Sequence, residues 1–214
     1  MSNTLSHTTQ FKNNPATFLD SFVVIADSTK ATGAVAATTK KFYIKYESKN
    51  VCTLRFAADD ATDFIEAYWL PWKQSDQTSM LLGAAAEFFF TSEMSNCRFS
   101  VLAEGTTPRV AHIAGNEGQR SKRNEYEKTA MASVSKDDLK KVRRLSVSQG
   151  LKHGYFGSDA MTAEDKSSAF VFGRRQPDNT WKFYAQIAKG FMDGTILAKP
   201  LVNNVAIVKA CMEI

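Results

Sequence analysis

The sequence predicts an α+β protein in which β-strands dominate. Short apolar runs recur along the chain and are bounded by Gly, Pro, Asn, Asp or Ser, which is typical of strands. The region from Ser121 to about Leu145 has the composition expected of helices. Periodicity alone does not decide between a strand and a buried helix for Met80–Phe90, where a strand at Ala86–Phe90 is favoured. With 43% hydrophobic and 23% charged residues, the chain has the composition of a compact globular protein and not of a disordered one.

We expect a single domain over residues 1–214, because no Pro-rich or Ser-rich linker divides the chain. Residues 1–17, which are rich in Ser, Thr and Asn, predict a flexible lead-in. The formal net charge of +5 favours an acidic partner without specifying one. The sequence contains no apolar run long enough to span a membrane, and the polar segment Met1–Lys12 is unlike a Sec signal peptide.

The expected strands of the first half are Phe22–Ala26, Lys41–Glu47, Val51–Ala57, Phe64–Leu70 and Ala86–Phe90. The second of these partly alternates, with Phe42, Ile44 and Tyr46 on one face, and it forms a hairpin with the third. Pro71 ends the fourth strand, because proline cannot donate to a central ladder. Two more strands, Arg98–Ala103 and Arg109–Ala114, flank the turn Glu104–Pro108.

Two helices are expected next, Ser121–Val134 and Ser135–Leu145. Ser135 is a suitable N-cap for the second helix, and Asp137 and Asp138 fall in its first turn. After them, Ala169–Arg175 and Trp181–Ile187 flank Gln176–Thr180, which is a strong hairpin signal. Ile196–Leu197 and Val205–Met212 are expected to complete the sheet.

The three cysteines, Cys52, Cys97 and Cys211, are odd in number and include no CxxC pair. This pattern indicates reduced thiols, with neither a disulfide framework nor a zinc site, and we expect no metal and no cofactor. Cys52 and Cys211 are interpreted as packing residues. The histidines are His7, His112 and His153, and the contexts of His7 and His153 suit neither metal binding nor acid/base chemistry.

Cys97 and His112 form the one pair with a geometry for nucleophilic catalysis. If Arg98–Leu102 and Thr107–Ile113 pair around the loop Ala103–Thr106, Cys97 lies opposite His112, with Cβ atoms about 5 Å apart. A different even loop length makes the two residues diagonal neighbours, and an odd length places them on opposite faces. An adjacent imidazole can take the thiol proton. The alternative is that both residues only pack in the core.

A family resemblance supports the catalytic interpretation. Leu70-Pro-Trp-Lys-Gln74, then Thr91-Ser-Glu-Met-Ser-Asn-Cys97, then His112-Ile113, resemble in order and spacing the motifs of the Burkholderia lethal factor family. The fifteen-residue step from Cys97 to His112 is also similar to that of the catalytic domain of cytotoxic necrotizing factors. The resemblance covers Phe64–Ile113 and, more weakly, the hairpin Ala169–Gly190.

The resemblance implies a central β-sandwich of mixed and antiparallel sheets flanked by helices, and hydrolysis of a protein glutamine to glutamate. It assigns Cys97 as nucleophile, His112 as acid/base and Thr91 as a third residue of the site. Ser95 and Asn96 would support the turn and the oxyanion. The glycine that precedes the cysteine in the family is Asn96 here, which is tolerated if that position has a positive φ and obstructs substrate if the backbone must be approached closely.

The implied substrate is a host DEAD-box translation-initiation helicase, whose deamidation would block translation. The expected protein is a monomer, made in a bacterial cytoplasm, secreted or delivered without a Sec signal, and active in the host cytosol. Three alternatives stay open: a deamidase or transglutaminase of Rho-type GTPases, a catalytically inactive binding protein of the same fold, and a nucleic-acid-binding module. The last would use a basic helix face of Lys136, Lys140, Lys141, Arg143 and Arg144.

Overall fold

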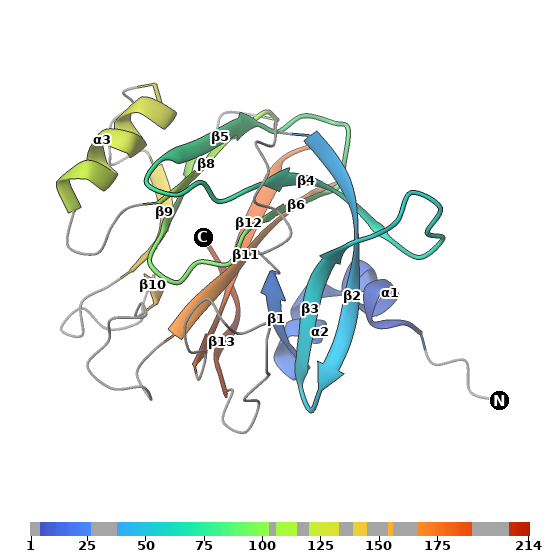
Figure 1. The fold of residues 1–214 in the computed structure, drawn as a ribbon. Helices are drawn as coiled ribbons and strands as arrows, with labels where there is room; N and C mark the ends of the chain where they lie inside the picture. The colour runs from blue at the N-terminus through green and yellow to red at the C-terminus, as the bar shows by residue number, and fades with distance from the viewer. Residues whose placement is uncertain are drawn as a thin grey trace.

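The computed structural model describes residues 5–26, 38–102, 106–114, 120–132, 139–144, 154–155, 167–189 and 206–214. These ranges form two β-sheets that pack face to face, with helices on the outer face of each sheet (Figure 1). The molecule is therefore an α+β protein built on a β-sandwich, as predicted.

The larger sheet has eight strands in the order β1-β3-β2-β4-β6-β11-β12-β13. Their bounds are β1 Val23–Ala26, β2 Thr38–Ser48, β3 Val51–Phe56, β4 Ile65–Leu70, β6 Phe88–Thr91, β11 Ser167–Arg175, β12 Trp181–Lys189 and β13 Ala206–Glu213. The pairs β1/β3 and β4/β6 are parallel, and the other neighbours are antiparallel. The parallel β4/β6 pair matters for the site, because it aligns the ends of the two strands that carry most of the motif.

The smaller sheet has five strands in the order β10-β9-β7-β8-β5. They are β5 Gln77–Leu81, β7 Arg98–Leu102, β8 Arg109–Ile113, β9 Leu139–Arg144 and β10 Gly154–Tyr155. The strand β8 lies between β7 and β5 and pairs antiparallel with both. A residue of β8 that points inward is therefore shielded by a strand on each side.

The core between the sheets follows the alternation of side chains along the strands. On β6, Phe89 faces the inter-sheet core, whereas Phe88 and Phe90 belong to the outer cluster. On β8, Val110 faces inward, whereas Ala111 and Ile113 pack toward α3, Arg120–Ala130. Successive residues of a strand point to opposite faces, so Thr91 and His112 both point into the space between the sheets.

The prediction of a flexible N-terminal lead-in was wrong for the residues that the structure describes. Residues 7–21 form two short helices, α1 His7–Asn13 and α2 Pro15–Ser21, capped by the side chains of Ser6 and Asn14. Phe11 is fully buried in an aromatic cluster beneath the large sheet. The polar composition hid this pattern because only three large apolar residues, Phe11, Phe18 and Leu19, are buried in it.

A buried glutamine ties this segment to the sheet. The amide of Gln186, in β12, donates to the carbonyl oxygens of Leu19 and Phe22 at 2.9 and 2.7 Å and accepts from the Val24 N–H at 2.9 Å. A buried amide whose donors and acceptor are all satisfied fixes the position of the chain around it. The N-terminal helices are thus part of the folded body.

The second predicted helix was also wrong. Residues 139–144 form β9 instead, paired with β7, while Ser135, Asp137, Asp138 and Leu145 lie outside the described residues. Alternation explains the outcome: Leu139 packs against α3, and Val142 enters the inter-sheet core. Pairing with β7 satisfies the backbone of both strands, and this tertiary gain outweighs a weak helical propensity.

The remaining predictions fare better. The strands predicted near β1, β2, β3, β4, β6, β7, β8, β11, β12 and β13, both hairpins and the first helix, α3, are confirmed with shifted ends. The strands β5 and β10 were not predicted. The strand predicted at Ile196–Leu197 and residue His153 lie outside the described residues.

Phe11 provides a test of the N-terminal helices. We expect Phe11→Ala to lower the free energy of unfolding by about 3–5 kcal/mol, because truncating a buried aromatic side chain leaves a cavity. Lys12→Ala, at an exposed position of the same helix, is expected to change it by less than about 0.5 kcal/mol. Chemical denaturation measures both. Equal effects of the two substitutions would show that α1 does not pack on the sheet in solution.

Candidate functional site

The segments that carry the sequence motif meet at one end of the sandwich. Leu70 and Thr91 are partners in the parallel pair β4/β6. The Leu70 carbonyl accepts hydrogen bonds from the Thr91 hydroxyl at 2.7 Å and from the Ser92 N–H at 3.4 Å. The Trp72 N–H donates in turn to the Ser92 hydroxyl at 2.9 Å. The spacing of the motif thus reflects two strand ends that are bonded side by side.

A hydrogen bond between Thr91 and His112 connects the two sheets. The distance from Thr91 Oγ1 to His112 Nδ1 is 2.7 Å, and both residues are buried. Since the single hydroxyl proton of Thr91 is donated to Leu70, its oxygen must accept from the imidazole. His112 therefore carries its proton on Nδ1, and Nε2 holds the free lone pair.

The free nitrogen of His112 is buried and, among the described residues, has no hydrogen-bond partner. Burial lowers the pKa of His112 to about 3, because the charged imidazolium is poorly solvated there. The ring is therefore neutral at physiological pH. A neutral imidazole with a fixed tautomer and an unused Nε2 has the form that a general base requires.

The predicted register, which pairs Cys97 with His112, was wrong by two residues. His112 lies opposite Phe99, and Cys97 precedes Phe99 by two residues, so Cys97 and His112 are diagonal neighbours on the same face. Pro108 explains the shift. In the predicted register it would pair within β7/β8, where a central strand between two partners has no place for a residue without an N–H.

Cys97 precedes β7 and packs at the edge of the inter-sheet core, with 7% of the residue exposed. Burial raises the pKa of its thiol to about 12, while a backbone hydrogen bond at Asn96, the positive charge of Arg123 and a hydrogen bond from the Trp72 side chain each lower it. The thiol is therefore protonated at rest. The resting pair consists of a neutral thiol and a neutral imidazole.

The loop that delivers Cys97 is anchored to the large sheet. Met94 is completely buried and exchanges two hydrogen bonds with Ala169 of β11, at 3.0 and 2.9 Å. Ser95 is exposed at the tip of the loop. Asn96 is not among the described residues with positive φ, so a left-handed backbone does not explain why asparagine replaces glycine here.

Three residues near Cys97 escaped the sequence reasoning. Trp72 lies within the motif Leu70–Gln74, and its side chain forms a hydrogen bond with the thiol. Arg123 acts on the thiol from α3, and Glu93 lies four residues before Cys97 with its Oε1 buried. Burial raises the pKa of Glu93 to about 7, and a hydrogen bond from Ser168 opposes this shift. The position of Trp72 within the motif Leu70–Gln74 could have indicated its place near the site, whereas nothing in the sequence links Arg123 to Cys97.

Among the described residues, the other two thiols and the imidazole of His7 have structural surroundings. Cys52 is buried in β3, and Cys211 packs partly buried against the outer cluster. His7 stacks on Tyr46 and meets Phe22 edge to face. Within the described ranges, no group of three or more His, Cys, Asp or Glu residues is arranged to hold a metal. No helix there combines the length and the apolar character that crossing a membrane requires.

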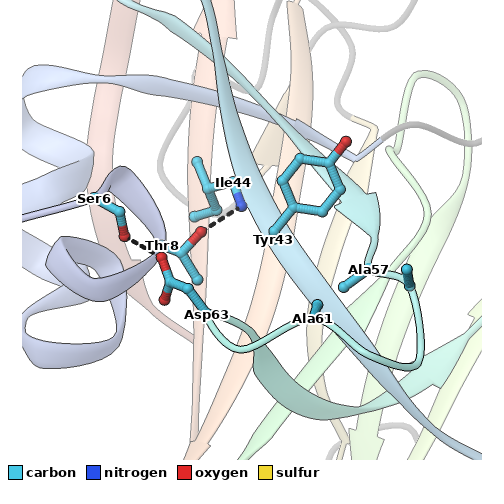
Figure 2. Close-up of a pocket in the computed structure, with 8 residues that line it drawn as sticks. Ser6, Thr8, Tyr43, Ile44, Ala57, Ala61 and Asp63 are labelled. Atoms are coloured by element: carbon cyan, nitrogen blue, oxygen red, sulfur yellow. Dashed lines mark hydrogen bonds between the residues drawn. The ribbon is translucent and has the colours of Figure 1, made fainter.

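A surface pocket of about 390 Å³, which does not include Cys97 or His112, lies between α1, β2 and the turn after β3 (Figure 2). It is lined by Ser6, Thr8, Tyr43, Ile44, Ala57, Ala58, Ala61 and Asp63. Its polar side chains are largely engaged: Asp63 accepts from Ser6 and Thr9, and Thr8 accepts from the Ile44 N–H. This pocket offers neither a nucleophilic thiol nor an imidazole.

The tautomer of His112 can be observed directly. Nitrogen chemical shifts from ¹⁵N-labelled protein are expected to report a proton on Nδ1 in the wild type and in Thr91→Ser, which keeps the hydroxyl. In Thr91→Val the Nδ1 proton loses its acceptor, so we expect the Nε2-protonated form to become populated and stability to fall by about 1–3 kcal/mol. A wild-type ring protonated on Nε2 would contradict the assignment.

His112 and Glu93 should give opposite pH dependences of stability. Above its ordinary pKa of 6.5, His112 is neutral in both states; as the pH falls toward its folded pKa of about 3, only the unfolded chain gains the proton and stability is lost. The folded pKa of Glu93 is raised to about 7 from 4.5, so its contribution is present below 4.5 and is lost as the pH rises to about 7.

Between about pH 4.5 and 6.5 the two contributions therefore oppose each other. In Glu93→Gln only the contribution of His112 remains, so we expect the free energy of unfolding to rise with pH in this window. In His112→Gln only the contribution of Glu93 remains, so we expect it to fall with pH. Denaturation at several pH values measures the slopes. Identical slopes for the two variants would refute the assignment of these buried groups.

A scan against models of protein families and a search of curated proteins each found no match. Among solved structures, the chain is similar to the C-terminal domain of CNFy from Yersinia pseudotuberculosis, with 9% sequence identity and a TM-score of 0.42. The alignment covers 87% of this chain and 75% of the other. A similarity of this size does not by itself assign a function to the chain.

Proposed function

We propose that the protein is a toxin-type glutamine deamidase that uses Cys97 as nucleophile and His112 as acid/base. The observation that carries the proposal is the state of His112: Thr91 fixes the proton on Nδ1, and Nε2 is left unpartnered among the described residues, on the face that Cys97 shares. A histidine that only stabilised the core would be expected to use both nitrogens. The motif resemblance supplies the reaction class.

In this reaction the thiol proton passes to His112 Nε2 as the sulfur attacks the carboxamide carbon of a glutamine side chain. The tetrahedral intermediate then collapses, the C–N bond breaks, and the imidazolium gives its proton to the departing ammonia. The resulting thioester is attacked by a water molecule that His112 deprotonates, which releases glutamate and restores the thiol. A primary amine in place of water would give transglutamination.

The electrostatics favour proton transfer during the attack rather than before it. With a thiol pKa of about 12 and an imidazole pKa of about 3, the proton belongs to sulfur in the resting protein. An ion pair would be costly in this dry environment. The role of Thr91 in the proposal is to hold the ring orientation and to stabilise the transient imidazolium through its oxygen.

The proposed substrate is a host protein, with a DEAD-box translation-initiation helicase preferred over a Rho-type GTPase because the resemblance includes Leu70–Gln74. Deamidation of the helicase would block translation. The proposal includes delivery from a bacterial cytoplasm to the host cytosol without a Sec signal, action as a monomer, and no requirement for nucleic acid. Lys141, one of the residues of the predicted basic helix face, lies instead on β9 and forms an ion pair with Glu127.

Peptide mass spectrometry tests the proposal. A translation-initiation helicase and a Rho GTPase are each incubated with the wild type, Cys97→Ser and the matched control Cys52→Ser, in which a buried thiol outside the site is changed. We expect the small mass gain of an amide converted to an acid at one glutamine, with wild type and Cys52→Ser only. Conversion by Cys97→Ser would exclude a thioester mechanism.

A second candidate, a binding protein of the same fold without activity, is favoured by the burial of the thiol and its raised pKa. The two candidates differ in their response to Cys97→Ser, which abolishes deamidation but leaves binding intact. Stable binding of the helicase by wild type and variant alike, with no modified glutamine, would favour the binding protein.

A further inference from the structure

The helix α3 packs on the outer face of the small sheet, against β5 and β8 (Figure 1). Glu127 is 2% exposed and is the centre of a buried polar cluster, accepting from Arg98 at 2.8 Å, Ser100 at 2.5 Å and Lys141 at 3.0 Å. Arg98 directly follows Cys97 in the chain. The ion pair between Glu127 and Arg98 therefore attaches α3 to the segment that carries Cys97.

A second attachment fixes the direction in which α3 crosses the end of the sheet. The Tyr126 hydroxyl donates to the Ser75 carbonyl at 2.6 Å, just before β5. Asn124 accepts from Arg98 at 3.1 Å. These bonds place the first turns of α3 over the sheet end, where Cys97 enters β7.

Arg123 occupies the sheet-facing side of these turns, four residues before Glu127 and seven before the buried Ala130. Its Nη1 is buried and, among the described residues, has no hydrogen-bond partner. A buried guanidinium N–H without an acceptor carries a desolvation cost, which a native protein retains where a ligand supplies the missing acceptor.

We infer that Arg123 is an anion-binding residue of the site, and that its free N–H receives the negative charge that develops at Cys97 during the reaction. The charge develops on the sulfur as its proton leaves during the attack, and then on the oxygen of the tetrahedral intermediate. A cationic donor placed in advance stabilises both in a dry site. The inference rests on the proposed function, and its residue comes from an element that shows no resemblance to the toxin family.

The test follows Cys97 without any protein substrate. Methyl methanethiosulfonate reacts with the thiolate, and peptide mass spectrometry separates Cys97 from Cys52 and Cys211. At a fixed alkaline pH we expect Arg123→Gln to slow modification of Cys97 about tenfold, since losing a nearby opposite charge raises a pKa by about one unit or more. Arg123→Lys, which keeps the charge, should react at nearly the wild-type rate.

Lys122→Gln is the matched control, because it removes the same charge from the neighbouring, exposed position of α3. It should leave the rate unchanged, and none of the variants should shift the thermal midpoint. Equal rates for Arg123→Gln and the wild type would overturn the inference, as would equal slowing by Lys122→Gln or a Cys97 that fails to react in every variant. Slowing by Arg123→Gln alone, with no glutamine modified in any target, would count against the proposed function only.

Discussion

The arrangement of the candidate site depends on one shared acceptor, the Leu70 carbonyl at the end of β4. This carbonyl accepts the hydrogen bond from the Thr91 hydroxyl, so the hydroxyl oxygen can only accept from His112. The proton of His112 is therefore fixed on Nδ1. One backbone group in the large sheet therefore sets the protonation of a side chain in the small sheet. The Thr91–His112 hydrogen bond joins opposite layers of the sandwich, so the geometry of the site depends directly on how the two sheets pack.

The dry interior gives the site its electrostatic character. Between the sheets, charged forms of Cys97 and His112 are both disfavoured, so the pKa of the thiol is raised and that of the imidazole is lowered. Both groups are therefore neutral at physiological pH. The groups that oppose the penalty, Trp72 and Arg123, come from segments on either side of Cys97 in the sequence, and each supplies an N–H or a positive charge to the sulfur. The structure thus combines a buried thiol with groups that stabilise its charged form.

Buried polar clusters hold the outer layers. Glu127 joins α3 to β7 and β9 through three donors, and Gln186 joins the N-terminal helices to β12. Removing one partner from such a cluster leaves another buried and unsatisfied, which is costly. The aromatic contacts around Phe11 add apolar packing on the far side of the large sheet. Both helical layers are consequently held by contacts that are distant in sequence.

The sequence by itself determined most strands, both hairpins and the site residues as candidates, because alternation, turn residues and motif spacing are local properties. Strand alternation places Phe89 and Thr91 on one face of β6, and Val110 and His112 on one face of β8. Only the tertiary structure decided the rest. The register of β7 and β8 depended on the exclusion of Pro108 from a central ladder, and residues 139–144 became a strand because β7 offered a partner. The contacts of Trp72, Arg123 and Glu127 join segments far apart in the chain, and no local pattern encodes which distant segments will meet.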